Sequence, residues 1–167
     1  MKKLFLLFSI FSSFYNLFAV ENSDKAINQA ASLIREKKAE CVVVKNGKIT
    51  AIERGRGVSP LLNLFEKSPQ IMRDAAIVDK VIGRAAAFIV IKSQAVRVHA
   101  ELISEDAIEL LKQHNIAVSW SKKVPRILNR KRDGLCPLED SVLNISDPDK
   151  ALISMKKRIA ELMKKSE

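Results

Sequence analysis

The stretch CVVVKNGKITAI, residues 41–52, decides how the fold begins. Two runs that favour extended backbone flank Asn46-Gly47, and both of these residues tolerate a positive φ angle. Asn-Gly between two such runs is the strongest short signal for a β-hairpin. We therefore expect an antiparallel pair formed by residues 41–45 and 48–52.

Helical signals lie on both sides of this hairpin. Upstream, Ile27, Ala30, Ala31 and Ile34 recur at the spacing of one helical stripe. Downstream, a helix that begins near residue 79 would have a thin inner face built from Gly83 and alanines. Three further helices are expected, because each has a capping residue followed by an apolar stripe. The residues expected to cap or open the five helices are Ser23, Ser59, Asp79, Ser104 and Asp147.

Strands are expected between these helices. Residues 95–102 alternate apolar and polar side chains, residues 116–120 form a short strand, and residues 124–128 are a candidate for another strand. The pattern assigns no structure to the segment that precedes residue 79. Because strands linked by helices favour parallel neighbours, we predict an α/β fold in which a mixed sheet is covered by helices, as one domain at residues 23–167.

The N-terminus belongs to a different physical class. Lys2 and Lys3 precede an apolar run that holds five of the seven phenylalanines, and small residues follow. This pattern predicts a signal peptide at residues 1–19, so the protein would be exported to the periplasm or secreted. An uncleaved membrane anchor is one alternative. A start codon assigned too early, which would leave the protein in the cytoplasm, is another.

The chain is basic, with a formal net charge of +10. Loss of Lys2 and Lys3 would leave 27 basic residues against 19 acidic ones, a charge of +8. Such a field attracts anions in general. Only Trp120 lies near the basic cluster at residues 122–132, so no aromatic series is available for base stacking, and a solvated basic surface is favoured over a nucleic-acid interface.

Four separate segments, in order, resemble a known bacterial family. They are RGRGVSPLL at 54–62, VDKVIGRAAA at 78–87, VPRILNR at 124–130 and CPLE at 136–139. The match spans residues 40–149 and resembles the domain-of-unknown-function 1893 family. This resemblance implies a cytidine-deaminase-like fold, in which a helix, a hairpin and alternating helices surround a mixed sheet. It implies no reaction, and the N-terminal signal departs from a family that looks cytoplasmic.

A zinc deaminase needs His or Cys ligands and a catalytic Glu at the starts of two helices. The expected helix starts, at Asp79 and Ser104, supply neither His nor Cys. The string His99-Ala100-Glu101 falls within an expected strand and has no Pro-Cys-x-x-Cys after it. We therefore predict no metal and no cofactor.

Candidate site residues follow from the expected helix starts and strand ends, where α/β sheets bind ligands. Asp79, Lys80, Glu101 and Ser104 could meet in one crevice there. The alternatives are that Asp79 is a helix cap and that Lys80 is a solvated surface lysine. Cys136 could be a nucleophile if its pKa is lowered, or a small buried residue. The catalytic candidates are Asp79, Lys80, Glu101 and Cys136, and the ligand-binding candidates are Arg54, Arg56, Ser104, Asn129 and Arg130.

The function predicted from these residues is the binding of a small anionic or nucleotide-like ligand by a deaminase-like domain without zinc. A thiol- or lysine-dependent enzyme in the same crevice is an alternative, and a secreted basic adaptor for anionic polymers is another. A pairing of Cys41 with Cys136 stays open, as does the oligomeric state.

Overall fold

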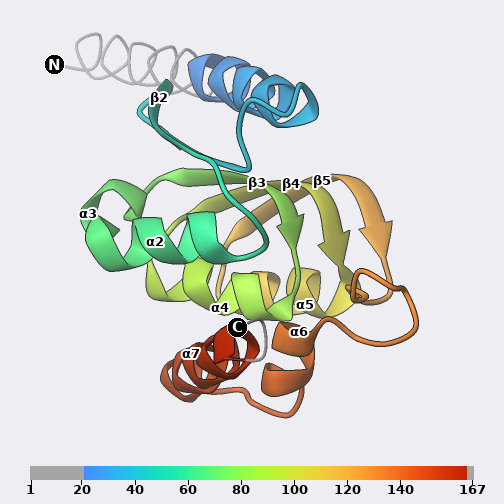
Figure 1. Cartoon of the computed structure of the whole chain (residues 1–167). Coiled ribbons are helices and arrows are strands. Elements are labelled where there is room, and N and C mark those ends of the chain that lie inside the picture. The colour runs from blue at the N-terminus through green and yellow to red at the C-terminus, as the bar shows by residue number, and fades with distance from the viewer. Residues whose placement is uncertain (1–20, 165–167) are drawn as a thin grey trace, which may run out of the picture.

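A computed structural model describes residues 21–164 of the chain. Five strands form one mixed sheet in the order β2-β1-β3-β4-β5 (Figure 1). β1 pairs antiparallel with both β2 and β3, whereas β3, β4 and β5 run parallel to one another. The strands are β1 (Cys41–Lys45), β2 (Lys48–Glu53), β3 (Ala76–Ile82), β4 (Arg97–Ser104) and β5 (Ala117–Val124).

Helices cover both faces of this sheet. The helix at residues 21–35, blue in Figure 1, lies on one face, where Ile27 and Ile34 pack with Val42 and Val78. The opposite face carries α2 (Ser59–Lys67), α3 (Pro69–Met72), α4 (Arg84–Lys92) and α5 (Glu105–Gln113). Outside α4, the pair α6 (Pro137–Val142) and α7 (Pro148–Lys164) adds a further helical layer.

The main hydrophobic core lies between the sheet and α4. All residues of α4 from Ala85 to Val90 are buried, and its three alanines form part of the thin inner face that the sequence predicted. Phe88, Ile77 and Leu111 are among the fully buried side chains of this core. Each such side chain contributes about 1.5–3 kcal/mol on burial, and together these side chains hold the sheet, α4 and α5 in one core.

Several local predictions are confirmed. The turn between β1 and β2 has Asn46 at φ 52° and Gly47 at φ 71°, the positive values that this pair was expected to adopt. Ser104 caps α5, because its hydroxyl oxygen accepts a hydrogen bond from the Ala107 amide at 3.2 Å. The mixed sheet covered by helices is also confirmed, together with the helix, hairpin and alternating order that the resemblance to a cytidine-deaminase-like fold implied.

Other predictions are wrong. Asp79 does not cap a helix: it lies inside β3, and α4 begins at Arg84 after Gly83. The cause is that Ile82 ends a strand yet falls at helical spacing from the alanines of α4. Residues 124–128 form no strand, because β5 already extends to Val124 and Leu128 makes only an isolated bridge with Leu135.

The predicted signal peptide at residues 1–19 lies outside the described residues. Between residues 21 and 164, none of the helices combines the length and the apolar content needed to cross a bilayer.

Candidate functional site

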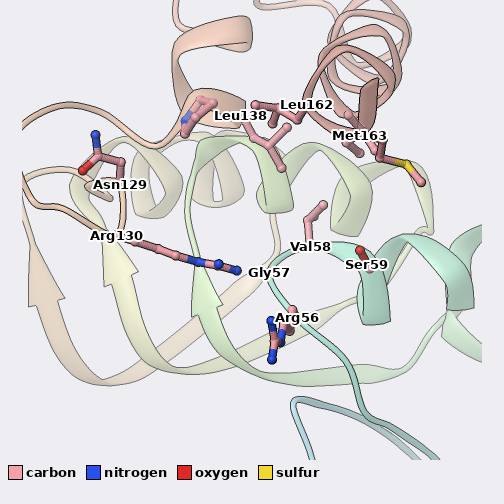
Figure 2. Close-up of a pocket in the computed structure, with 11 residues that line it drawn as sticks. Arg56, Gly57, Val58, Ser59, Asn129, Arg130, Leu138, Leu162 and Met163 are labelled. Atoms are coloured by element: carbon pink, nitrogen blue, oxygen red, sulfur yellow. The ribbon is translucent and has the colours of Figure 1, made fainter. Parts of the chain in front are cut away.

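A cavity of about 550 Å³ lies between two loops and the last helix. Its lining comes from the loop before α2, from the loop at residues 129–130, from the start of α6 and from the end of α7 (Figure 2). This volume is within the range of ligand pockets in proteins. The lining residues are Arg56, Gly57, Val58, Ser59, Asn129, Arg130, Pro137, Leu138, Ile159, Leu162 and Met163. We call this space the outer cavity.

Two arginines from different loops supply the charge of the outer cavity. Arg56 and Arg130 are both exposed, and Figure 2 shows the Arg130 side chain extending toward Gly57. Within residues 21–164, neither guanidinium takes part in an ion pair. A guanidinium presents five N–H donors in a planar fork that matches carboxylate and phosphate oxygens. The pair can therefore receive an anion.

The opposite wall is apolar. Leu138 from α6 and Ile159, Leu162 and Met163 from α7 line it. Apolar walls with a few converging polar groups are typical of sites for small organic molecules. The outer cavity therefore suits a ligand that combines an anionic group with an apolar body.

Local backbone geometry shapes the two loops. Gly57 has φ 58°, a left-handed conformation that glycine adopts without a steric penalty. Asn129 closes the second loop with two hydrogen bonds. Its backbone N–H donates to the Gly134 carbonyl at 2.9 Å, and its side-chain Nδ2 donates to the Asp133 carboxylate at 2.8 Å. The side-chain oxygen of Asn129 is buried and accepts no hydrogen bond from the described part of the chain.

A second cavity, of about 80 Å³, adjoins the first. Gly57, Val58 and Leu138 line both spaces. The smaller space, which we call the inner cavity, also contacts the end of β3 and the start of α4. Two buried carboxyl groups, those of Asp79 and Glu139, are the acidic groups in its lining.

Asp79 is almost fully shielded from solvent, with only 7% of the residue exposed. Burial raises its pKa from 3.8 to about 7, because the ionised carboxylate loses its hydration there. The Val81 amide donates to Asp79 Oδ1 at 2.9 Å, and this hydrogen bond together with the Cys41 side chain on the paired strand β1 opposes the rise in the pKa of Asp79. Burial also raises the pKa of Cys41 well above its ordinary value, so this thiol is no thiolate nucleophile.

Glu139 caps α4 from a distance in sequence. Its two oxygens accept hydrogen bonds from the Arg84 amide at 2.8 Å and from the Ala85 amide at 3.0 Å. Burial raises its pKa, and the two amide hydrogen bonds oppose that shift. Gly83 makes the contact feasible, since a Cβ atom there would lie 2.6 Å from the Glu139 carboxyl carbon.

The predicted crevice of Asp79, Lys80, Glu101 and Ser104 is wrong as a grouping. Side chains alternate along a strand, so Asp79 faces the inner cavity while Lys80 points to the other face of the sheet. There the Lys80 amine pairs with Glu40 at 2.9 Å, and Glu101 accepts from Arg35 at 2.9 Å. Ser104 is fully buried at the start of α5, which it caps, and is outside both linings.

The remaining candidates are divided too. Arg56, Asn129 and Arg130 come together in the outer cavity, and their role in binding stays a prediction. Arg54 is outside both linings and donates from Nε to the Lys38 carbonyl at 2.8 Å. Cys136 is half-buried just before α6, next to the lining residue Pro137, and both it and Cys41 are free thiols.

Two features of the site were missed from sequence. α6 was not predicted, although Cys136-Pro137 marks a helix start because proline is favoured in the first turn. Glu139 was quoted only as part of a motif, and nothing local shows that it reaches the start of α4. A capping role between segments far apart in sequence needs the tertiary structure.

The helix starts seen in the structure differ from the predicted ones, but they too lack residues that could bind zinc. α4 begins Arg84-Ala85 after the cap residue Gly83, and α5 begins Glu105-Asp106, so neither offers His or Cys. Across residues 21–164, no three His, Cys, Asp or Glu side chains gather closely enough to hold a metal ion.

Comparisons with known proteins place this architecture. A crystal structure of a DUF1893 family protein from Thermotoga maritima matches with a TM-score of 0.71 and 25% sequence identity, over 80% of this chain and 90% of that one. No curated protein sequence matches.

More distant structural matches are deaminases or carry the name RibD. RibD from Acinetobacter baumannii matches at TM-score 0.44 and 15% identity, over 60% of this chain and 35% of that one. The dCMP deaminase from the cyanophage S-TIM5 matches at TM-score 0.43 and 16% identity, over 62% and 98% of the two chains. Likeness at this level carries no information on activity.

The family comparison is more direct. The family model described as "Domain of unknown function (DUF1893)" matches residues 20–159, which is most of the chain and includes every segment on which the resemblance was based. The protein therefore belongs to the DUF1893 family.

Proposed function

We propose that this domain binds a small anionic ligand with an apolar body, nucleotide-like in that respect, in the outer cavity. The observation that carries the proposal is the convergence of Arg56 and Arg130, from two loops far apart in sequence, on one cavity of about 550 Å³. Their guanidinium groups have no acidic partner within residues 21–164. An anion would supply the missing charge.

The apolar wall supports an organic ligand over a bare ion. Leu138, Ile159 and Met163 present carbon atoms to the cavity, and they would bury part of the ligand body. The net charge of +10 raises the local concentration of anions around the whole surface. Binding energy would then come from both ends of the cavity.

Calorimetric titration tests this proposal with inorganic phosphate and the four ribonucleoside 5′-monophosphates at low ionic strength. We expect at least one nucleotide to bind more tightly than phosphate. Arg56→Gln and Arg130→Gln should each weaken that binding by about tenfold or more, since a charge-assisted hydrogen bond is worth about 1.5–3 kcal/mol.

Arg54→Gln is the matched control. It removes the same charge from the same loop but outside the cavity, so it should change affinity by less than about twofold. Absence of binding by every probe at millimolar concentration would overturn the proposal. Equal losses in all three variants, with a steep dependence on salt, would instead support the adaptor for anionic polymers.

A further inference from the structure

The inner cavity has room for a few atoms and no more. Its volume of about 80 Å³ exceeds what one water molecule needs, and it would admit the edge of a ring or a single substituent. Apart from Asp79 and Glu139, its walls consist of glycines and the apolar residues Val58, Leu61, Val81, Ala85, Ala86 and Leu138. A group that enters therefore meets carbon atoms on most sides.

The side chains that can hydrogen-bond in this space are both carboxyl groups. Glu139 already accepts from the Arg84 and Ala85 amides, which fixes its orientation. Asp79 accepts from the Val81 amide through Oδ1 at 2.9 Å. A carboxylate has about four acceptor positions, so acceptor capacity is left over on both groups. The complementary ligand group is a donor.

The two cavities are arranged so that one molecule could occupy both. Arg56 lines the outer cavity, and the next two residues, Gly57 and Val58, line both. Leu138 does the same from α6. At Gly57 a Cβ atom would meet nothing within 4 Å, so the space beside this residue is open.

We infer that the inner cavity is a subsite for a hydrogen-bond donor of the same ligand, with Asp79 as its acceptor. The ligand class is thereby narrowed to anions that carry an amino group on a flat or small apolar body. This inference rests on the proposed function, since the anionic end would be held by Arg56 and Arg130.

Protonation of Asp79 should tune this subsite. With its pKa at about 7, the carboxyl group is mostly protonated at pH 6 and mostly ionised at pH 8. The charged or titratable groups around it are the Cys41 thiol and Glu40 from the side of β1 and Glu139 across the cavity. A donor on the ligand favours the ionised form, so its contribution should grow by up to about tenfold between these pH values.

Matched ligand pairs test the inference. AMP is compared with purine riboside 5′-monophosphate, and CMP with pyrimidin-2-one riboside 5′-monophosphate; in each pair only the amino group is missing from the second member. In the wild-type protein we expect a preference of about fivefold or more for the amino member of at least one pair at pH 8. Both members carry the same phosphate, so the ratio cancels its titration.

Asp79→Asn should reduce this preference to less than about twofold and should leave the contribution of Arg130 intact. If that variant failed to fold, the wild-type preference measured at pH 6 and pH 8 would decide alone, because it should rise with pH. Nucleotide binding that depends on Arg56 and Arg130 but ignores the amino group would overturn this inference while preserving the proposed function. Absence of all nucleotide binding would overturn both.

Discussion

Asp79 and Lys80 are neighbours in β3, yet their side chains lie on opposite faces of the sheet and in different environments. Asp79 is buried beside Cys41 and faces a cavity, with no cation within ion-pair distance among residues 21–164. Lys80 is about half exposed and pairs with Glu40. The Asp79 carboxyl on the α4 face is thus desolvated, whereas the Lys80 amine on the face of the N-terminal helix is paired and partly hydrated.

This difference supports placing the proposed site on the α4 face of the sheet. Ion pairs such as Arg35–Glu101 and Arg97–Asp24 satisfy the charges on the face of the N-terminal helix. On the α4 face, buried carboxyl groups with raised pKa values adjoin open space. Perturbed titratable groups beside a cavity are a feature of functional sites. Four measurements test this contrast between the two faces.

The largest effect is expected from Glu139→Ala on the α4 face. It removes the acceptor of two amide hydrogen bonds at the start of α4, and each unsatisfied buried donor costs about 1–3 kcal/mol. We expect the free energy of unfolding in urea to fall by about 2–4 kcal/mol. Glu101→Ala, the matched loss of a carboxylate on the other face, should cost less than about 1 kcal/mol. Equal losses would contradict the contrast between the faces.

The next effect is expected from Asp79→Asn, through pH. The pKa of folded Asp79, about 7, lies above its ordinary value of 3.8, so between these pH values the unfolded chain binds fewer protons than the folded one. Its contribution to stability is complete below about pH 4 and is lost as the pH rises through 7. Asp79→Asn should remove this decline and stabilise the protein at pH 8 by on the order of 1–3 kcal/mol.

Urea denaturation at several pH values between 4 and 8 measures that change. Lys80→Gln, one residue along on the opposite face, is the control and should leave the slope as it is. A wild-type stability that rises from pH 5 to pH 8, with no change of slope in the Asp79 variant, would refute a desolvated Asp79.

Much of the fold could be predicted because its signals are local. Asn46-Gly47 fixes a turn through its own φ angles, and Ser104 caps α5 through an amide three residues away. β3 was missed for the opposite reason. Asp79-Lys80 interrupts an apolar run, and that run is a strand only because β1 and β4 lie on either side of it. Pairing partners far along the chain do not appear in a local pattern.

The site shows the same division. Arg56 was singled out by the glycines around it, which is a local signal. The alternation of side chains separates Asp79 from Glu101, and this could not be known before Asp79 was assigned to a strand. Glu139 depends on the packing of α6 against α4, so its role required the assembled structure.

A third, smaller effect is expected from His99 on the face of the N-terminal helix. Burial lowers the pKa of His99, and the positive charges of Arg35 and Arg97 lower it further. The negative charge of Glu101 opposes this shift. The unfolded chain then binds more protons below pH 6.5, so this contribution to stability is present above that pH and is lost as the pH falls. The sign is opposite to that of Asp79.

His99→Asn should therefore reduce the loss of stability on acidification from pH 7 to pH 5, by less than the Asp79 change. Asparagine can keep a contact with Ser119, whose hydroxyl lies 3.0 Å from His99 Nδ1. Measuring this change in the Asp79→Asn background removes the opposite pH dependence of Asp79, so only the contribution of His99 remains. If the free energy of unfolding fell more steeply between pH 7 and pH 5 in the His99→Asn variant, the imidazole of the folded wild-type protein would be charged, which would contradict the prediction.

The smallest effect is expected from the Lys80–Glu40 pair. The lysine side chain is 49% exposed, and ion pairs of this kind contribute from about 0.2 to 1 kcal/mol. A double-mutant cycle with Lys80→Gln and Glu40→Gln should give a coupling within that range, and it should shrink further in 0.5 M salt because of screening. A coupling above about 2 kcal/mol that resists salt would mean that this face also holds a desolvated charge, and the distinction between the two faces would fail.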